Sequence, residues 1–94
     1  MKFSDFEKIK TNSPIGEQVI LDFGRWELSI VRNEASYGHQ QNLWEIGVFK
    51  DGSMVEAPGI TEAGDTIKGW LTENDIDVII KKMATMTGNE PIQI

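Results

Sequence analysis

A period-two alternation of apolar and polar residues runs through much of the first half of the chain and constrains its fold most. Successive side chains of a β-strand point to opposite faces, so such alternation predicts strands with one apolar face. The apolar members fall into three segments: Val19, Leu21 and Phe23; Trp26, Leu28 and Ile30; and Trp44, Ile46 and Val48. We expect these segments to form an antiparallel sheet whose apolar face is the core.

Turn residues separate these segments. Gly24 stands between the first two, and Asp51-Gly52 follows the third with the chemistry of a type I′ hairpin turn. A fourth strand is predicted over 53–57, and a fifth over 66–71, although Gly69 interrupts the latter. The predicted sheet therefore covers residues 18–71.

The pattern after residue 72 predicts a helix over 73–87. Thr72 is a good N-cap with Asp75 at the third helical position, and Gly88 suits a left-handed C-terminus. One apolar stripe at helical spacing would face the sheet, and its members are Ile76, Ile79, Ile80 and Met83. Residues 88–94 are interpreted as a tail.

A short helix is also predicted at the N-terminus, over residues 4–11. Ser4 and Glu7 have the spacing of a capping box. Its apolar edge would be Phe3, Phe6 and Ile9, and the residues expected to end it are Asn12, Ser13, Pro14 and Gly16.

Together these elements predict one α+β domain over residues 1–94. Its sheet would be an antiparallel meander of four or five strands, with the C-terminal helix packed on one face. The opposite face is not cleanly polar, because it would carry Ile20, Val31, Leu43, Phe49 and Trp70. Either the N-terminal helix covers this face, or it is a partner surface.

The composition excludes several classes of function. The net charge of −6 argues against binding to nucleic acid or to anionic lipid. The absence of cysteine excludes disulfides and thiolate chemistry. The first ten residues have scattered charges and no apolar segment, so we expect a cytoplasmic protein without an export signal or a membrane span.

The negative charge is concentrated in residues 51–80, which hold seven acidic residues and one basic residue. Three of these acids belong to the predicted helix, where they have structural roles. The remaining acids are Asp51, Glu56, Glu62 and Asp65, which we interpret as an acidic edge, although Asp51 also belongs to the turn.

The segment 33–42 is a long polar connection between two strands. Long connections of this kind are often functional. Its composition resembles a recognition loop, with Arg32 before it and Tyr37, His39, Gln40 and Gln41 within it. The plainer alternative is an exposed loop whose Tyr37 folds back onto the sheet edge.

No catalytic or metal-binding constellation stands out. Ser36 and His39 lack a nucleophile elbow, and Glu27 and Glu45 would be solvated carboxylates on adjacent strands. One histidine without cysteine makes a metal site improbable. We therefore expect neither an enzyme nor a cofactor.

The first functional hypothesis is a small acidic protein-interaction module. Its size and character point to an inhibitor or accessory factor of phage or mobile-element type acting on a host protein. The predicted partner-binding residues are Arg32, Tyr37, His39, Gln40, Gln41, Phe49, Asp51, Glu56, Glu62, Asp65 and Trp70.

The alternative hypothesis is a homo-oligomer that binds a small ligand between subunits. Its pocket would gather Arg32, Tyr37 and His39 with Trp44 or Trp70 around an anionic or aromatic compound. In both hypotheses a second copy of the chain is a possible partner.

Overall fold

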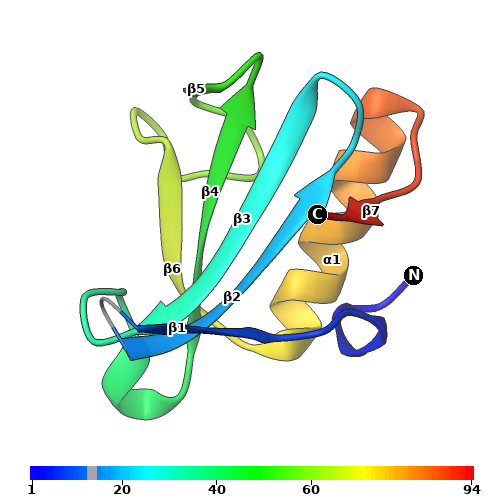
Figure 1. The fold of residues 1–94 in the computed structure, drawn as a ribbon. Helices are drawn as coiled ribbons and strands as arrows, with labels where there is room; N and C mark the ends of the chain where they lie inside the picture. The colour runs from blue at the N-terminus through cyan, green and yellow to red at the C-terminus, as the bar shows by residue number, and fades with distance from the viewer. Residues whose placement is uncertain (13–14) are drawn as a thin grey trace.

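One α-helix and a seven-stranded antiparallel sheet make up the described part of the chain, residues 1–12 and 15–94 of a computed structural model. Figure 1 shows the helix lying against one face of the strongly twisted sheet. The α+β class and the single domain are confirmed. The strands are β1 (Ile9–Asn12), β2 (Ile15–Asp22), β3 (Trp26–Asn33), β4 (Trp44–Lys50), β5 (Ser53–Met54), β6 (Ile67–Leu71) and β7 (Ile92–Gln93). The helix is α1 (Glu73–Thr87), and two short 3-10 turns are η1 (Phe3–Asp5) and η2 (His39–Gln41).

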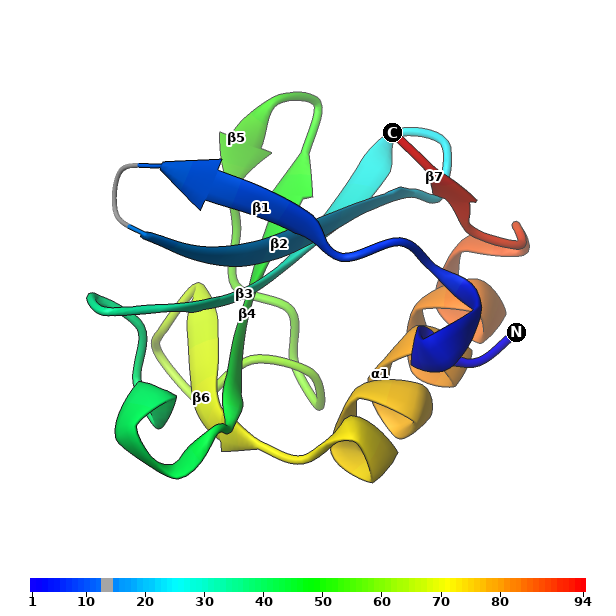
Figure 2. The ribbon, with the colours of Figure 1, turned by 60° about the horizontal axis from the view of Figure 1, so that its bottom comes forward.

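The strand order begins as a meander and then departs from it. Strands β2 to β5 pair in chain order, as the predicted meander required, but the sheet has seven strands rather than four or five, because β1 and β7 add to it. The chain then returns past β5, and β6 pairs with β4 on residues 44–47, while β5 pairs with residues 49–50. At the other end of the sheet, β1 and β7 both pair with β2, at 15–18 and 21–22 respectively. Figure 2 shows the resulting bend of the sheet around the helix.

Both predicted tight turns are present. Gly24 has φ 94°, and the amide of Phe23 donates to the carbonyl of Trp26 at 2.8 Å. Asp51 and Gly52 both have positive φ, 52° and 85°, as a type I′ turn requires.

The predicted helix is confirmed in extent and in capping. The Thr72 hydroxyl accepts from the Asp75 amide at 3.2 Å, and the Asp75 carboxylate accepts from the Thr72 amide at 2.9 Å. Gly88 is left-handed, with φ 73°. The buried residues of the helix are Ile76, Ile79, Ile80 and Met83, as the stripe predicted.

The predicted N-terminal helix is wrong. Its place is taken by η1 and then β1, whose extended backbone pairs with β2 from Ile9 onward. So short a helix is marginal by itself, and pairing with β2 satisfies the same backbone groups. Phe3 and Phe6 are buried in the core beside α1, whereas Ile9 is 46% exposed, so this segment does not cover the opposite face of the sheet. The break expected at Ser13 and Pro14 lies outside the described residues.

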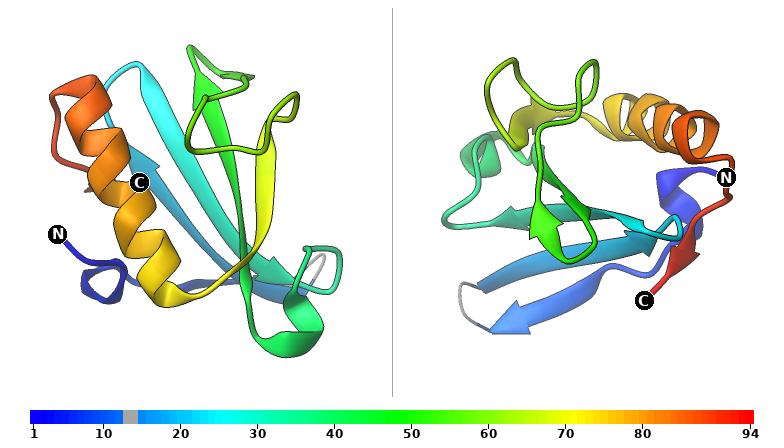
Figure 3. Two further views of the ribbon diagram at one scale, coloured as in Figure 1. Left: turned by 180° about the vertical axis from the view of Figure 1, so that it is seen from behind. Right: turned by 90° about the horizontal axis from the view of Figure 1, so that it is seen from above.

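The C-terminal tail is part of the fold. Pro91 is buried, and Ile92 and Gln93 pair with β2 as β7. The Gln93 side chain accepts from the Glu7 amide at 2.9 Å, which joins the two ends of the chain. Figure 3 shows both termini beside α1 and the adjoining edge of the sheet.

The core lies between α1 and the face of the sheet predicted to be apolar. Its sheet residues are fully buried, except that Trp26 is only partly buried. The amide of Phe3 also donates to the Asp77 carboxylate of α1 at 2.7 Å. Within the described residues, no helix has the length and apolar character needed to cross a membrane.

Candidate functional site

The polar loop between β3 and β4 rests on β6. A Cβ added to Gly69 would lie 2.4 Å from the Cβ of Tyr37, so Tyr37 packs directly over that glycine. A Cβ on Gly38 would lie 3.1 Å from the Cα of Trp70. The amide of Trp70 donates to the carbonyl of Tyr37 at 3.4 Å, and the carboxylate of Glu45 accepts from the Tyr37 amide at 2.8 Å. Two residues without side chains therefore allow the close approach.

A β-bulge turns Trp70 outward. Trp44 pairs with Leu71 and Ile46 pairs with Lys68, so Gly69 and Trp70 together oppose the single residue Glu45. Trp70 has φ 62° and its side chain is 57% exposed. A left-handed backbone costs a residue other than glycine about 1–2 kcal/mol. The fold thus holds a large aromatic side chain in solvent at an energetic cost.

The loop also has a defined internal structure. The Ser36 hydroxyl donates to the Asn33 carbonyl at 2.8 Å and accepts from the Asn33 amide at 2.9 Å. The 3-10 turn η2 follows between Gly38 and Asn42, which are both left-handed. Since the Ser36 hydroxyl already serves this turn, it has no nucleophile geometry toward His39.

The structure brings seven of the eleven predicted binding residues together. One shallow hollow is lined by Tyr37, His39, Gln40 and Gln41 with Trp70, and a second by Tyr37, Glu62, Asp65 and Trp70. Tyr37 is 58% exposed, nearly as much as Trp70. We call this set the Trp70 surface, and its members are Tyr37, His39, Gln40, Gln41, Glu62, Asp65 and Trp70.

The other four predicted residues lie outside the Trp70 surface, although the Arg32 guanidinium also donates to the carbonyl of Asn42 at the end of the loop, at 3.3 Å. Arg32 forms an ion pair with Glu17 at 2.5 Å and lies 4.3 Å from the centre of the Trp44 ring. The Glu56 carboxylate accepts from the amide of Gly64 within its own loop. The last two, Phe49 and Asp51, lie at the far end of β4 from the loop and in the turn after it.

The acidic edge is therefore divided. The Arg25 guanidinium donates twice to the Asp51 carboxylate, at 3.0 and 2.8 Å, and the Asp51 amide donates to the Arg25 carbonyl at 2.9 Å. The hydrogen bond from Arg25 lowers the pKa of Asp51 below its ordinary value of 3.8, with smaller contributions from the charges of Arg25 and Lys50. Asp51 thus closes a hairpin, and Glu62 and Asp65 are the acids that remain beside Trp70.

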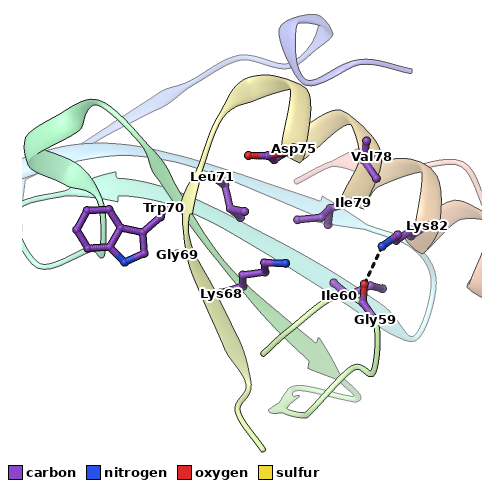
Figure 4. A pocket seen from close by; sticks show the side chains of 10 residues that line it. All are labelled: Gly59, Ile60, Lys68, Gly69, Trp70, Leu71, Asp75, Val78, Ile79 and Lys82. Atoms are coloured by element: carbon purple, nitrogen blue, oxygen red, sulfur yellow. Dashed lines mark hydrogen bonds between the residues drawn. The ribbon is translucent and has the colours of Figure 1, made fainter. Parts of the chain in front are cut away.

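A groove that the sequence did not predict lies on the other side of β6. It runs between α1 and the segment 58–60, and Figure 4 shows Lys68 and Leu71 pointing toward α1 while Trp70 points away from it. We call it the α1 groove. Its residues include Pro58, Ile60, Lys68, Leu71, Val78, Ile79, Lys81, Lys82 and Met86, and Trp70 borders it at β6. The sequence carries a signal for this groove: Val78, Lys82 and Met86 have i, i+4 and i+8 spacing and form a second stripe on the helix.

Glu27 and Glu45, the two carboxylates on neighbouring strands, lie apart in the sheet. Glu27 pairs with Phe49 and Glu45 with Val31, so the two carboxylates do not oppose each other across the strands. Within residues 1–12 and 15–94, no group of three metal-ligating side chains occurs, and no buried polar side-chain atom lacks a hydrogen-bond partner. The candidate sites are thus surface features.

No protein-family model, curated protein or solved structure matched the chain in comparisons with known proteins.

Proposed function

We propose that this protein is a protein-interaction module that binds its partner through the Trp70 surface. The observation that carries the proposal is Trp70 itself, an exposed indole in a left-handed conformation. Backbone strain and β-bulges both concentrate at functional sites. An exposed tryptophan that costs stability is explained if a partner buries it.

The neighbours of Trp70 have the composition of a protein interface. Tryptophan and tyrosine are enriched among residues that dominate binding energy, and polar amides around them provide adaptable hydrogen bonds. Tyr37 stands beside Trp70, and the rim residues His39, Gln40 and Gln41 border both. These hollows are shallow, which favours a macromolecular partner over a small enclosed ligand.

The negative charge of the Trp70 surface favours a partner whose binding surface carries basic residues at its rim. Two acids, Glu62 and Asp65, and one base, Lys68, line the hollow beside Tyr37 and Trp70, and the chain carries a net charge of −6. Complementary charge speeds encounter and selects partners. An inhibitor or accessory factor of phage or mobile-element type is the form of module that we favour, supported by the small acidic chain alone.

Quantitative affinity capture with variants tests the proposal. A partner should be retained by the wild-type protein and by Ile92→Ala, which removes a different exposed apolar side chain, 71% exposed. The same partner should be lost with Trp70→Ala and reduced with Tyr37→Ala, while circular dichroism shows each variant folded. Equal capture by Trp70→Ala, or no stoichiometric partner for the wild-type protein, would contradict the proposal.

The open face of the sheet favours a second candidate function, self-association. Register places Ile9 opposite Gln18 and Ile92 opposite Asp22, on the face away from α1. Ile9 is 46% exposed and Ile92 is 71% exposed, and the half-buried Phe49 shares this face. Exposed apolar side chains on an uncovered face of a sheet are a common feature of interfaces.

This second candidate differs from the predicted ligand-binding oligomer. Trp44 is 1% exposed and Arg32 is paired with Glu17, so neither is free to line a pocket with Tyr37. Sedimentation velocity over a range of concentrations tests self-association. Phe49→Glu should abolish a dimer that Trp70→Ala leaves intact, and a wild-type protein that stays monomeric throughout excludes it.

A further inference from the structure

The helix α1 presents two stripes of side chains, and only one faces the core. The second stripe comprises Val78, Lys82 and Met86, and Val78 and Met86 are 55% and 46% exposed. Pro58 and Ile60 form the facing wall, and the hollow between them and α1 holds about 630 Å³. Two exposed apolar side chains of α1, with Lys82 between them, thus line one wall of this groove.

The rim of this groove is basic in a chain that is acidic overall. Lys68, Lys81 and Lys82 line it, and none of them forms an ion pair within the described residues. Lys82 donates to the carbonyl of Gly59 at 2.9 Å, which leaves two of its three donors free. Asp75 also lines the groove, but one of its oxygens accepts from the Thr72 amide in the helix cap.

Four basic side chains outside the groove have partners of their own. Arg25 and Arg32 are in ion pairs with Asp51 and Glu17. Lys8 and Lys50 lie over the rings of Phe3 and Trp26, at 4.3 and 5.0 Å from the ring centres. The positive charges of Lys81 and Lys82, by contrast, are not neutralised by an ion pair within the described residues.

The edge of β6 that borders the groove is poorly suited to pairing with an added strand. The amide of Glu62 donates to the carbonyl of Ile67 at 3.2 Å, and the amide of Trp70 donates to Tyr37. The bulge at Gly69 and Trp70 interrupts the regular spacing that strand addition needs. Recognition in this groove must use side chains, as when one amphipathic helix packs along another.

We propose that the α1 groove binds an amphipathic helix of the partner protein, with apolar residues at i, i+3 or i+4 spacing flanked by aspartate or glutamate. The apolar side chains contact Val78, Ile60 and Met86, and the carboxylates lie beside Lys81 and Lys82. The inference rests on the proposed function, because it assigns this groove and the Trp70 surface, on the two sides of β6, to one partner (Figure 4).

Selection from a library of random 16-residue peptides displayed on phage tests the groove directly. The full-length protein is the bait, and the double variant Lys81→Glu/Lys82→Glu is used in solution to remove peptides that bind elsewhere. Selected sequences should be enriched in aspartate and glutamate beside apolar residues at helical spacing. The best sequence, labelled with fluorescein, should become helical on binding, as measured by circular dichroism.

Binding of this labelled peptide should fall by about tenfold or more in Lys81→Glu/Lys82→Glu and should weaken as salt is raised. The matched control is Lys2→Glu/Lys10→Glu, which makes the same change in net charge at two exposed lysines outside the groove. It should change affinity much less. Fluorescence anisotropy measures both.

Several outcomes would overturn the inference. These are a selected pool without acidic enrichment, no enriched pool at all, a peptide that binds as a strand, and equal binding by the two double variants. A groove variant that alters sedimentation would instead identify a second copy of the chain as the occupant. The groove experiments use variants at Lys81 and Lys82 and leave Trp70 unchanged. A negative result there would contradict the groove proposal alone, whereas the capture experiment with Trp70→Ala tests the proposed function.

Discussion

Tyr37 occupies the space that a side chain on Gly69 would need. A Cβ added at Gly69 would lie 2.4 Å from the Cβ of Tyr37 and 3.4 Å from its Cγ and from its carbonyl oxygen. This contact fixes the polar loop against β6 at the point where the bulge turns Trp70 outward. The arrangement of the Trp70 surface thus depends on a glycine that itself contributes no side chain.

Gly69→Ala is expected to lower the free energy of unfolding by about 1–3 kcal/mol, because the new methyl group displaces Tyr37 or shifts the strand. It should also weaken partner binding. Urea unfolding followed by tryptophan fluorescence measures the stability. The control is Gly47→Ala on β4, where the nearest contact to an added Cβ is 3.4 Å, to the flexible end of Met54. If both alanines cost the same, the close packing of Tyr37 is not the cause.

The left-handed backbone of Trp70 predicts an unusual order of stability between two variants. Trp70→Gly should be more stable than Trp70→Ala by about 1 kcal/mol, because glycine adopts positive φ without a steric penalty. At an ordinary extended position of a strand the order is reversed. Lys68, which pairs regularly with Ile46, provides that control with Lys68→Gly and Lys68→Ala. Chemical denaturation of the four variants tests the prediction, and the same order at both positions would contradict it.

The ion pair between Arg25 and Asp51 predicts an effect of pH. Its hydrogen bond holds the pKa of Asp51 in the folded protein below the ordinary value of 3.8. The stability that this carboxylate contributes is therefore present above pH 3.8 and is lost as the pH falls through the lower, folded pKa.

Arg25→Met should raise the pKa of Asp51 toward its ordinary value and reduce this acid-dependent loss of stability. Carbon-13 NMR titration of the Asp51 carboxyl group measures the pKa. Lys50→Met is the control and should have a smaller effect, because the charge of Lys50 contributes least to lowering the pKa of Asp51. An unchanged titration in Arg25→Met would show that the ion pair does not persist in solution.

Replacing Phe3, close to the N-terminus, is expected to reduce the stability of the protein strongly. Its ring meets Trp44 edge to face, with centroids 4.8 Å apart and planes at 84°, and it is fully buried. Phe3→Ala should destabilise the protein by about 3–5 kcal/mol, as removal of a buried aromatic ring usually does. Met1→Ala, at a residue 61% exposed, should change stability by less than about 0.5 kcal/mol. Thermal and urea unfolding compare the two, and similar small effects would show that the N-terminal segment is not docked.

Much of the fold could be predicted from local patterns. Period-two alternation located β2, β3 and β4, and the chemistry of Gly24 and Asp51-Gly52 located their turns. These signals are reliable because the side chains and the turn residues act on their immediate neighbours. The helix α1 was predicted in the same way, from its cap, its stripe and Gly88.

The errors fall where short segments pair over long distances. Residues 4–11 have the spacing of a helix, but β2 offered backbone partners and the core offered space for Phe3. Residues 92–93 have no strand pattern of their own and become a strand because the same edge of β2 is open to them. A local pattern cannot report such competition between elements.

The sequence by itself determined the α+β class, the apolar face of the sheet and the acidic character, since each follows from residue type and spacing. The tertiary structure decided which predicted site residues act together. It placed Tyr37 on Gly69, turned Trp70 outward through a bulge, and paired Arg25 with Asp51 and Arg32 with Glu17. It also revealed the basic groove of α1. Lys68 on β6 and Lys81 and Lys82 on α1 are distant in the sequence, and only the packing of these segments brings them to one groove.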